Sequence, residues 1–265
     1  MPARQPKIMG IINATPDSFY DGGKCFSLEN AVKQGIDMYR EGADILDIGG
    51  ESTRPSAHPV GEEEELARVI PVIKTLKKEI PIPLSIDTMK PRVAAAAVEA
   101  GAAIINDVSG FRDPEMVQVA INASVPICVM HMKGTPKTMQ INPRYEQGVV
   151  SHLLQWFEER VNCLCHAGIK KNHIILDPGI GFGKTVDDNL KILQNLQRFT
   201  TMGFPLLLGL SRKSFMGKIV NKEASKLLSM TIAMNTIGLL AGVDIIRVHD
   251  VAEHRDIVEL ITHLK

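Results

Sequence analysis

The sequence lacks an excess of charge of either sign. Its 265 residues include 30 Lys and Arg and 30 Asp and Glu, so the formal net charge at pH 7 is zero. Proteins that bind nucleic acids or anionic membrane surfaces generally carry an excess of basic residues. The balance argues against both classes, and we expect neither a nucleic-acid partner nor a membrane partner. Any basic residue that matters for function must therefore act locally.

Cysteines and long apolar runs are also scarce. The four cysteines, Cys25, Cys128, Cys163 and Cys165, form no C-x-x-C pair and have no zinc-finger spacing to a histidine. Free thiols of this kind are typical of a reducing compartment. No apolar run reaches the ~18 residues of a membrane span, and the polar start does not resemble a secretory signal segment. We therefore expect a cytoplasmic protein.

The chain does contain a regular alternation of short apolar runs with amphipathic stretches. The runs are rich in Ile, Val and Leu, as is typical of parallel strands covered by helices. They span residues 8–13, 45–50, 84–88, 104–108, 127–131, 174–177, 206–210 and 245–249. Such an alternation fits a closed barrel or an open doubly wound sheet, but a count of eight favours the barrel, which needs about 250 residues. We predict an α/β fold, a single (β/α)8 TIM barrel domain spanning residues 1–265.

The intervening stretches have the periodicity and capping residues of helices. We predict helices over residues 145–166, 224–241 and 251–264. Pro71 lies inside the second predicted helix and should kink it. The four acids at positions 62–65 occupy the first turn of that helix, where negative charge complements the helix dipole. We therefore expect these acids to have a structural role.

Polar residues follow most of the predicted strands. Barrel enzymes place their active sites at the C-terminal ends of the strands, and polar residues at every end are hard to explain by helix capping alone. The residues at these ends are Asn13, Glu51, Ser52, Thr53, Arg54, Asp87, Asn106, Asp107, His131, Asp177, Ser211, Arg212, Lys213, Arg247, His249 and Asp250. We therefore predict an active site at this end of the barrel.

These residues can be sorted by the ligands that they suit. A multiply anionic group could be held by Arg54, Arg247 and His249, because arginine offers a fixed fork of donors. The loop from Asn13 through Asp17 to Gly23 can supply oxygen ligands to Mg²⁺, a hard cation that usually reaches proteins through phosphate oxygens. A heterocycle with an amidine-like donor edge would suit the acceptor and amide groups of Asp87, Asn106 and Asp177. Together they indicate a flat, nitrogen-rich substrate that carries a diphosphate.

Two familiar motifs are only approximated. Residues 178–185 resemble a phosphate-binding P-loop, but Pro178 occupies the position of the first glycine. The same segment misses the dinucleotide-binding pattern G-x-G-x-x-G, because Lys184 stands at the third glycine position. We expect its glycines to let the backbone pass close to a flat ligand. The absence of an H-E-x-x-H motif argues against a zinc hydrolase.

In combination, the strand-end motifs resemble those of the dihydropteroate synthase family. They extend over nearly the whole chain and comprise Met9-Gly10-Ile11-Ile12-Asn13-Ala14-Thr15-Pro16-Asp17-Ser18-Phe19, Gly50-Glu51-Ser52-Thr53-Arg54-Pro55, Ser85-Ile86-Asp87-Thr88, Asn106-Asp107, Met130-His131-Met132, Leu176-Asp177-Pro178-Gly179, Ser211-Arg212-Lys213-Ser214 and Arg247-Val248-His249-Asp250. Ser56 departs from the glycine that often follows Thr-Arg-Pro in this family. The departure bears on the conformation of that loop and not on the class of reaction.

The resemblance implies a transferase of folate biosynthesis. In this reaction, 6-hydroxymethyl-7,8-dihydropterin diphosphate and 4-aminobenzoate give 7,8-dihydropteroate and diphosphate. The resemblance also implies Mg²⁺, a homodimer and a target of sulfonamides. Because an arylamine is a poor nucleophile, departure of diphosphate is the difficult step. We therefore expect a dissociative substitution, in which diphosphate leaves before the amine attacks.

The resemblance further implies roles for individual residues. Asn13 would be linked to the metal. The pterin would be held by Asp87, Asn106, Asp177 and Lys213, with Met130 and Phe182 packed nearby. The diphosphate would be held by Arg54, Arg247 and His249, and the 4-aminobenzoate would be bordered by Thr53, Pro55, Lys213 and Ser214. The catalytic residues would be Arg54, Asp87, Lys213, Arg247 and His249.

Three other functions stay open at this point. A pterin-binding methyltransferase module would share the barrel and the pterin pocket, but would not need Thr53-Arg54-Pro55 or Ser211-Arg212-Lys213-Ser214. A non-catalytic pterin-binding protein would have kept the pocket alone, although the full set of charged residues argues against decay. A lyase could form a Schiff base through Lys213.

Overall fold

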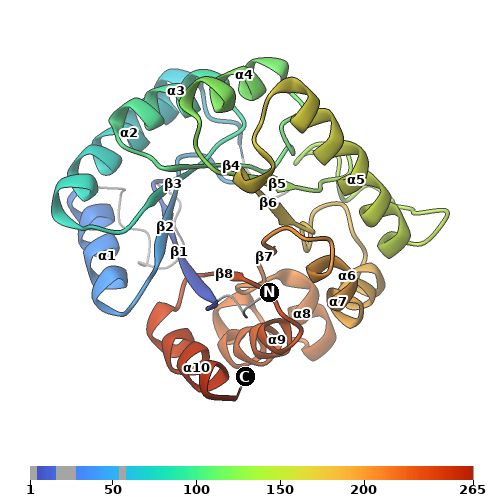
Figure 1. Ribbon diagram of the computed structural model, residues 1–265. Coiled ribbons are helices and arrows are strands. Elements are labelled where there is room, and N and C mark those ends of the chain that lie inside the picture. Colours follow the sequence, from blue (N-terminus) through green and yellow to red (C-terminus); the bar gives the residue numbers. More distant parts are fainter. Residues whose placement is uncertain (1–4, 16–27, 54–57, 265) are drawn as a thin grey trace.

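The computed structural model describes residues 5–15, 28–53 and 58–264, which form a barrel of eight parallel strands (Figure 1). Helices alternate with the strands and surround them (Figure 1). The strands are β1 (Lys7–Asn13), β2 (Ile45–Gly49), β3 (Leu84–Asp87), β4 (Ile104–Asp107), β5 (Ile127–Met130), β6 (Ile174–Asp177), β7 (Leu207–Leu208) and β8 (Ile245–Val248). Each predicted apolar run coincides with one of these strands, with β1 starting one residue before its run, so the predicted fold is confirmed.

The sheet is closed on itself between β6 and β7. Neighbouring strands pair in the order β6-β5-β4-β3-β2-β1-β8-β7. The two ends of this order meet in a parallel bridge between Leu176 and Leu206, where the Leu176 N–H donates to the carbonyl oxygen of Pro205 at 2.9 Å. This contact distinguishes the barrel from an open doubly wound sheet. β7 is shorter than its predicted run, because its regular pairing with β8 is limited to two residues.

Inside the barrel, alternate residues of the strands form two layers of side chains. The first layer is apolar and contains Met9, Ile45, Ile104, Cys128, Ile175, Leu207 and Ile245. Two residues further along the same strands stand Ile11, Asp47, Asn106, Met130, Asp177, Gly209 and Arg247. The period of two in each strand therefore places a mostly polar layer directly above an apolar floor.

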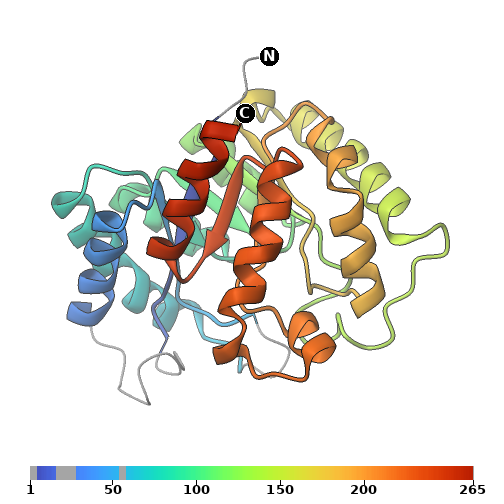
Figure 2. The same cartoon turned by 90° about the horizontal axis from the view of Figure 1, so that it is seen from below.

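The larger part of the core lies between the barrel and its helices. These helices are α1 (Leu28–Arg40), α2 (Glu62–Glu79), α3 (Pro91–Ala100), α4 (Pro114–Ala123), α5 (Val149–Ala167), α6 (Val186–Gln194), α7 (Leu196–Thr200), α8 (Ser214–Val220), α9 (Leu228–Leu240) and α10 (Val251–Leu264). Figure 2 shows α8 at the end of the barrel opposite to the C-terminal end of α10. Among the described residues, no helix is both long enough and apolar enough to span a membrane.

Two predicted helices begin later than expected. The prediction over 145–166 starts too early, because Gly148 has a φ of 77° and interrupts helical geometry immediately before α5. The prediction over 224–241 merges two elements, since residues 224–226 form a separate 3-10 turn before α9. The helix over Pro71 continues through that residue to Glu79.

The acids at the start of α2 are not all equivalent. Glu62, Glu63 and Glu64 fit the predicted role near the helix N-terminus, but the side chain of Glu65 is fully buried. It forms an ion pair with Lys90, which also pairs with the Glu51 carboxylate. The carboxylate of Glu51 accepts a hydrogen bond from the Val60 N–H at 3.2 Å. Glu65 is therefore part of a buried ion-pair network between the loops after β2 and β3, a role that position in a helix does not reveal.

Candidate active site

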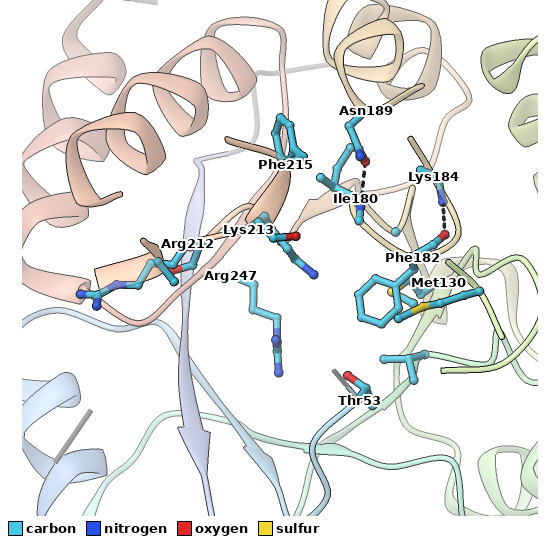
Figure 3. A pocket seen from close by; sticks show the side chains of 18 of the residues that line it. Thr53, Met130, Ile180, Phe182, Lys184, Asn189, Arg212, Lys213, Phe215 and Arg247 are labelled. Atoms are coloured by element: carbon cyan, nitrogen blue, oxygen red, sulfur yellow. Dashed lines mark hydrogen bonds between the residues drawn. The ribbon is translucent and has the colours of Figure 1, made fainter. Parts of the chain in front are cut away.

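A large pocket opens at the C-terminal ends of the strands. Its volume is about 1410 Å³, which is more than a drug-sized ligand requires. The structure brings most of the predicted site residues together in its wall, namely Asn13, Thr53, Asp87, Asn106, Met130, Asp177, Phe182, Lys213, Ser214, Arg247 and His249. In Figure 3, the side chains of Lys213 and Arg247 extend into the space bordered by Phe182 and Thr53. Arg54, Pro55 and Ser56 lie outside the described residues, as do residues 16–23 of the loop predicted to bind the metal.

Arg247 connects two carboxylates across the barrel. Its Nε donates to Asp47 Oδ2 at 2.6 Å, and its terminal nitrogen donates to Asp87 Oδ2 at 2.7 Å. Asn106 Nδ2 donates to the same oxygen of Asp47 at 2.9 Å. A guanidinium has more N–H donors than these two bonds use, so Arg247 can also donate to a ligand. The network fixes the guanidinium at the floor of the pocket.

Burial and charge determine the protonation of this network. Burial raises the pKa of Asp87 to about 7, while Arg247 acts in the opposite direction and Asp47 adds to the increase. Burial also disfavours the charged form of Arg247, but the two aspartates outweigh this effect and raise its pKa. Arg247 is therefore a permanent cation. Asp87 can gain or lose a proton near neutral pH.

Asp177 uses one carboxylate oxygen for the protein and presents the other towards the pocket. Its Oδ1 accepts a hydrogen bond from the Gly179 N–H at 2.7 Å. Its Oδ2 lies on the side of Gly209, whose lack of a side chain leaves room in front of it. Burial raises the pKa of Asp177, while the Gly179 N–H, Lys213 and Arg247 act against that shift. The carboxylate is thus held in one orientation with an acceptor available for a ligand.

Apolar side chains stand beside these polar groups, since Met130 is the neighbour of Asp177 on the adjacent strand. Met130 belongs to a small buried cluster with Val108, Met132 and Met139, against which Phe182 packs. The Lys213 ammonium lies 4.2 Å from the centre of the Phe182 ring, within the range of a cation–π interaction. A flat aromatic ligand can therefore lie against Phe182 and Met130 while its edge reaches the acids.

At the far rim, His249 and Arg212 have different partners. The Nδ1 of His249 lies 2.8 Å from Ser211 Oγ. Arg212 pairs with Asp250 and points away from the centre of the pocket (Figure 3). The backbone of Arg212 has a φ of 56°, which is uncommon for a residue with a side chain. The turn thereby directs Arg212 outward and the next residue, Lys213, inward.

The glycine loop, residues 178–184, is shaped mainly by contacts within the protein. A Cβ on Gly179 would lie 2.0 Å from the carbonyl oxygen of His131, and one on Gly183 would lie 2.7 Å from Cβ of Lys133. Both glycines also have positive φ angles. A Cβ on Gly181, in contrast, would lie 3.4 Å from the Lys213 side chain in the pocket. Close packing against β5 and the chain after it therefore requires Gly179 and Gly183. Gly179 and Gly181 line the pocket, and close approach of this loop to a flat ligand stays a prediction.

Two buried charged residues that lie at or beside the site, Asp47 and Lys184, are not predicted from the sequence. Asp47 stands in the middle of an apolar run, and its inward position in β2 was the available signal. In the sequence, Lys184 stands out only because it occupies the third glycine position of a dinucleotide-binding motif. Its ammonium lies 3.0 Å from His131 Nδ1 and donates to the carbonyl oxygens of His131 and Phe182 at 3.2 and 3.0 Å. No local pattern predicts that a lysine after a glycine-rich turn is buried.

Among the described residues, few oxygen donors lie near Asn13 in the sequence, since the chain after Thr15 is described again only from Leu28. Asn13 lies at the exposed end of β1 and lines the pocket. In the part of the chain that the structure describes, no group of three His, Cys, Asp or Glu residues could hold a metal ion. Mg²⁺ usually keeps several waters and binds through one or two protein ligands together with substrate phosphates. The residues present fit a cation that is held mainly by a bound diphosphate.

The fold and the pocket define a barrel enzyme with a site for a flat, nitrogen-rich heterocycle beside an anion-binding group. The family model described as "Pterin binding enzyme" matches residues 9–249. A dihydropteroate synthase of Haemophilus influenzae is 44% identical over 255 residues, which cover 96% of this chain and 92% of that protein. The chain therefore belongs to the pterin-binding enzyme family and, within it, to the dihydropteroate synthases.

Solved structures agree with this assignment. A Yersinia pestis dihydropteroate synthase in a complex with a sulfonamide drug has a TM-score of 0.94 and 39% identity, over 98% of this chain and 94% of that one. A Xanthomonas albilineans dihydropteroate synthase in complex with 7,8-dihydropteroate has a TM-score of 0.89 and 40% identity, over 100% and 95% of the two chains. The resemblance inferred from the strand-end motifs is thus confirmed. Membership among these transferases decides against the methyltransferase module, the non-catalytic binder and the lyase.

Proposed function

We propose that the chain condenses 6-hydroxymethyl-7,8-dihydropterin diphosphate with 4-aminobenzoate to give 7,8-dihydropteroate and diphosphate. The observation that supports this most directly is the arrangement of one pocket. The buried acceptors of Asp177 and Asn106 share one pocket with the apolar side chains of Phe182 and Met130 and with the guanidinium of Arg247, and Met130 stands beside Asp177 on the neighbouring strand. Such a pocket suits a flat heterocycle with N–H donors on one edge and an anionic substituent.

The pterin contacts can be assigned from chemistry. An amidine-like edge donates hydrogen bonds, and an ionised Asp177 with its oriented Oδ2 is the strongest acceptor for it. Asn106 can both donate and accept, so it suits the neighbouring edge of the ring. Asp87, deep in the pocket beside Arg247, would stabilise positive charge that spreads through the pterin as diphosphate leaves. Lys213 would contact the exposed side of the ring.

The diphosphate would lie towards Arg247 and His249, with Arg54 as a further cation according to the sequence motif. Mg²⁺ would bind to its oxygens and to Asn13. When bound, this ion would stabilise the negative charge that builds up on the departing diphosphate. The 4-aminobenzoate would approach beside Thr53 and Ser214, and beside Pro55 according to the sequence motif. A dissociative substitution fits this site, because its cations face the leaving group.

A direct assay tests the proposed reaction. The chain is incubated with the pterin diphosphate, 4-aminobenzoate and Mg²⁺, and both 7,8-dihydropteroate and diphosphate are measured. We expect the two products in equal amounts, and loss of turnover when a chelator removes Mg²⁺. Absence of dihydropteroate at every metal concentration would contradict the proposal.

The pKa of Asp87 predicts a pH dependence of pterin binding. A ring with N–H donors prefers the ionised carboxylate, but with a pKa of about 7 the empty site takes up a proton as the pH falls. Binding should therefore release a proton, and affinity should fall about tenfold for each pH unit below 7. Calorimetry with 6-hydroxymethyl-7,8-dihydropterin, which carries no diphosphate, in buffers of different ionisation enthalpy measures this. Proton uptake on binding, or constant affinity from pH 5 to 7, would contradict it.

The homodimer also remains a proposal, and α9 is the surface that supports it. Its outer face carries the exposed apolar residues Ile237 and Leu240, which are 48% and 58% exposed, and Ile219 at the end of α8 is 48% exposed. Exposed apolar residues that gather on one helix are typical of an interface between subunits. The free thiols of Cys128, Cys163 and Cys165 accord with the proposed cytoplasmic location.

A charge on α9 is expected to dissociate the dimer. Leu240→Glu would place a carboxylate in an apolar interface, and light scattering after gel filtration should then report a monomer where the parent chain is a dimer. Ile141→Glu is the matched control, because Ile141 is 74% exposed and lies in the loop before α5. An unchanged dimer for Leu240→Glu would place the interface elsewhere.

A further inference from the structure

Lys184 is a buried cation for which the proposed reaction has no role. The residue is only 3% exposed, and its three hydrogen-bond partners all belong to the protein. Two of them, the ring and the carbonyl oxygen of His131, lie at the end of β5. The third, the carbonyl oxygen of Phe182, belongs to the glycine loop. Burying an ammonium costs free energy, so a lysine that serves only to fill space would be replaced without loss by an apolar side chain.

The position of Lys184 explains why its hydrogen-bond donors matter. The ammonium joins the two segments of the pocket wall that carry Met130 and Phe182. Figure 3 shows the bond from Lys184 to the Phe182 carbonyl, with the Phe182 ring on the side of Met130. A shift of that carbonyl would move the ring relative to Met130 and Lys213. Lys184 thus acts on the face of the pocket against which a flat ligand would lie.

The chemistry of His131 agrees with a fixed role for this contact. Burial lowers the pKa of His131, and the adjacent Lys184 acts in the same direction, so the ring is neutral. A neutral ring that accepts at Nδ1 carries its proton on Nε2. The ring also packs edge to face on Trp156, with a distance of 5.0 Å between ring centres. Lys184 is thereby anchored on one side to a rigid aromatic cluster behind β5.

The rest of the glycine loop is held in the same manner. Its Gly183 carbonyl accepts from the Tyr145 hydroxyl at 2.7 Å, and its Gly181 carbonyl accepts from Gln140 Nε2 at 2.6 Å. The Gly181 N–H donates to Asn189 Oδ1 at 2.8 Å. Side chains from outside the loop therefore determine the path of its backbone. Lys184 is distinguished from them by its charge, which burial opposes by lowering its pKa to about 7 and which Asp177 supports.

We propose that Lys184 is a positioning residue for the pterin half of the site: its ammonium ties the Phe182 carbonyl to His131 and so sets the Phe182 ring against the bound heterocycle. The proposal rests on the proposed function, because it takes a pterin as the ligand of this half of the pocket. Lys184 lines the pocket, and its ammonium is engaged with His131 and with the Phe182 carbonyl. Its removal should therefore weaken pterin binding selectively and leave the 4-aminobenzoate side of the pocket intact.

The test compares Lys184→Met with the parent chain. Methionine has nearly the same length and is apolar, but it has no donor for the Phe182 carbonyl. We expect the Kd for 6-hydroxymethyl-7,8-dihydropterin, measured by calorimetry, to rise at least tenfold, and the KM for the pterin diphosphate to rise with it. The KM for 4-aminobenzoate should change less than threefold. Lys191→Met on α6 is the matched control, because Lys191 is exposed and pairs with Asp187 in its own helix; it should change neither constant.

A double-mutant cycle tests whether Lys184 acts through the Phe182 ring. Phe182→Leu alone should also weaken pterin binding. If the ring transmits the effect, adding Lys184→Met to Phe182→Leu should weaken binding less than twofold further. Fully additive losses would overturn the proposed route through Phe182, and equal losses in both KM values would overturn a role specific to the pterin.

Two further results separate the possible failures. If Lys184→Met does not fold, Lys184→Arg is used instead, because it keeps the charge and the N–H donors on a bulkier group. Its loss of affinity should also be specific to the pterin, and smaller than the loss expected for Lys184→Met. A parent chain that does not bind the pterin contradicts the proposed function itself. A parent chain that binds the pterin, with Lys184→Met or Lys184→Arg binding it equally well, contradicts only the positioning role.

Discussion

Replacing Asp177 with asparagine is expected to reduce pterin affinity at least a hundredfold while leaving the fold intact. The asparagine carbonyl can still accept the hydrogen bond that Asp177 Oδ1 accepts from the Gly179 N–H at 2.7 Å. The amide nitrogen then takes the place of Oδ2 on the pocket side, so its N–H groups face the N–H donors of the pterin. A charge-assisted hydrogen bond contributes about 1.5–3 kcal/mol, and an unpaired buried donor adds to the loss. Since about 1.4 kcal/mol corresponds to a tenfold change, the sum reaches two orders of magnitude.

The effect on stability should be small, because an isosteric amide replaces a buried acid whose burial already raises its pKa. Calorimetry with the pterin and thermal unfolding measure the two quantities separately. Asp107→Asn is the matched control at the end of the next-but-one strand. The Asp107 carboxylate accepts from the backbone of Ser109 and Phe111 and from the Ser109 hydroxyl, so its loss should affect unfolding and not pterin affinity. Near-parental affinity in Asp177→Asn would remove Asp177 from the pterin site.

The sequence was informative wherever function depends on a position in a strand. Each parallel strand presents alternate residues to the barrel interior, and all strands end on the same side. Asp87, Asn106, Asp177 and Arg247 could therefore be placed in one pocket from their positions at the ends of apolar runs. The pairing of Arg247 with Asp47 could not be predicted, because these residues are 200 positions apart and are brought together only because β8 and β2 both pair with β1.

Loops were less predictable for a related reason. The glycine loop has a sequence that suggests ligand contact, yet the space available to Gly179 and Gly183 is limited by β5 and the chain that follows it. Lys184 illustrates the same limit, since an ammonium is normally exposed and its burial depends on carbonyl oxygens that the fold supplies. Helix starts were misplaced where a single backbone angle decides them, as at Gly148. Such features depend on tertiary packing, which local patterns do not contain.

Replacing Arg247 with methionine is expected to lower both the stability and the activity of the chain. The side chain of Asp47 is fully buried and that of Asp87 is 14% exposed, and Arg247 is the cation between them. Removing one partner of a buried ion pair typically costs about 3–5 kcal/mol. Loss of donors at the leaving group should in addition reduce kcat about 10²–10³-fold. Urea unfolding and steady-state kinetics measure the two effects.

The stability deficit should depend on pH in a defined direction. Asp87 has a higher pKa in the folded chain than in the unfolded chain, and without Arg247, which lowers it, that pKa should rise further. The folded variant then binds a proton more tightly than the unfolded one. Its stability therefore decreases as the pH rises above about 4, and the deficit should be larger at pH 8 than at pH 5.5. Arg92→Met is the control: Arg92 forms solvent-exposed pairs with Glu62 and Glu63, so its loss should change the stability little, and by the same small amount at pH 5.5 and at pH 8.

The double variant Asp47→Asn with Arg247→Met separates the two roles of the arginine. Removing the carboxylate that is left without a cation should restore most of the lost stability, because the amide needs no counter-charge. Activity should stay low, since the donors proposed to hold the diphosphate are still missing. Recovery of kcat together with stability would show that Arg247 only maintains the barrel interior, and the proposed contact with the leaving group would have to be withdrawn.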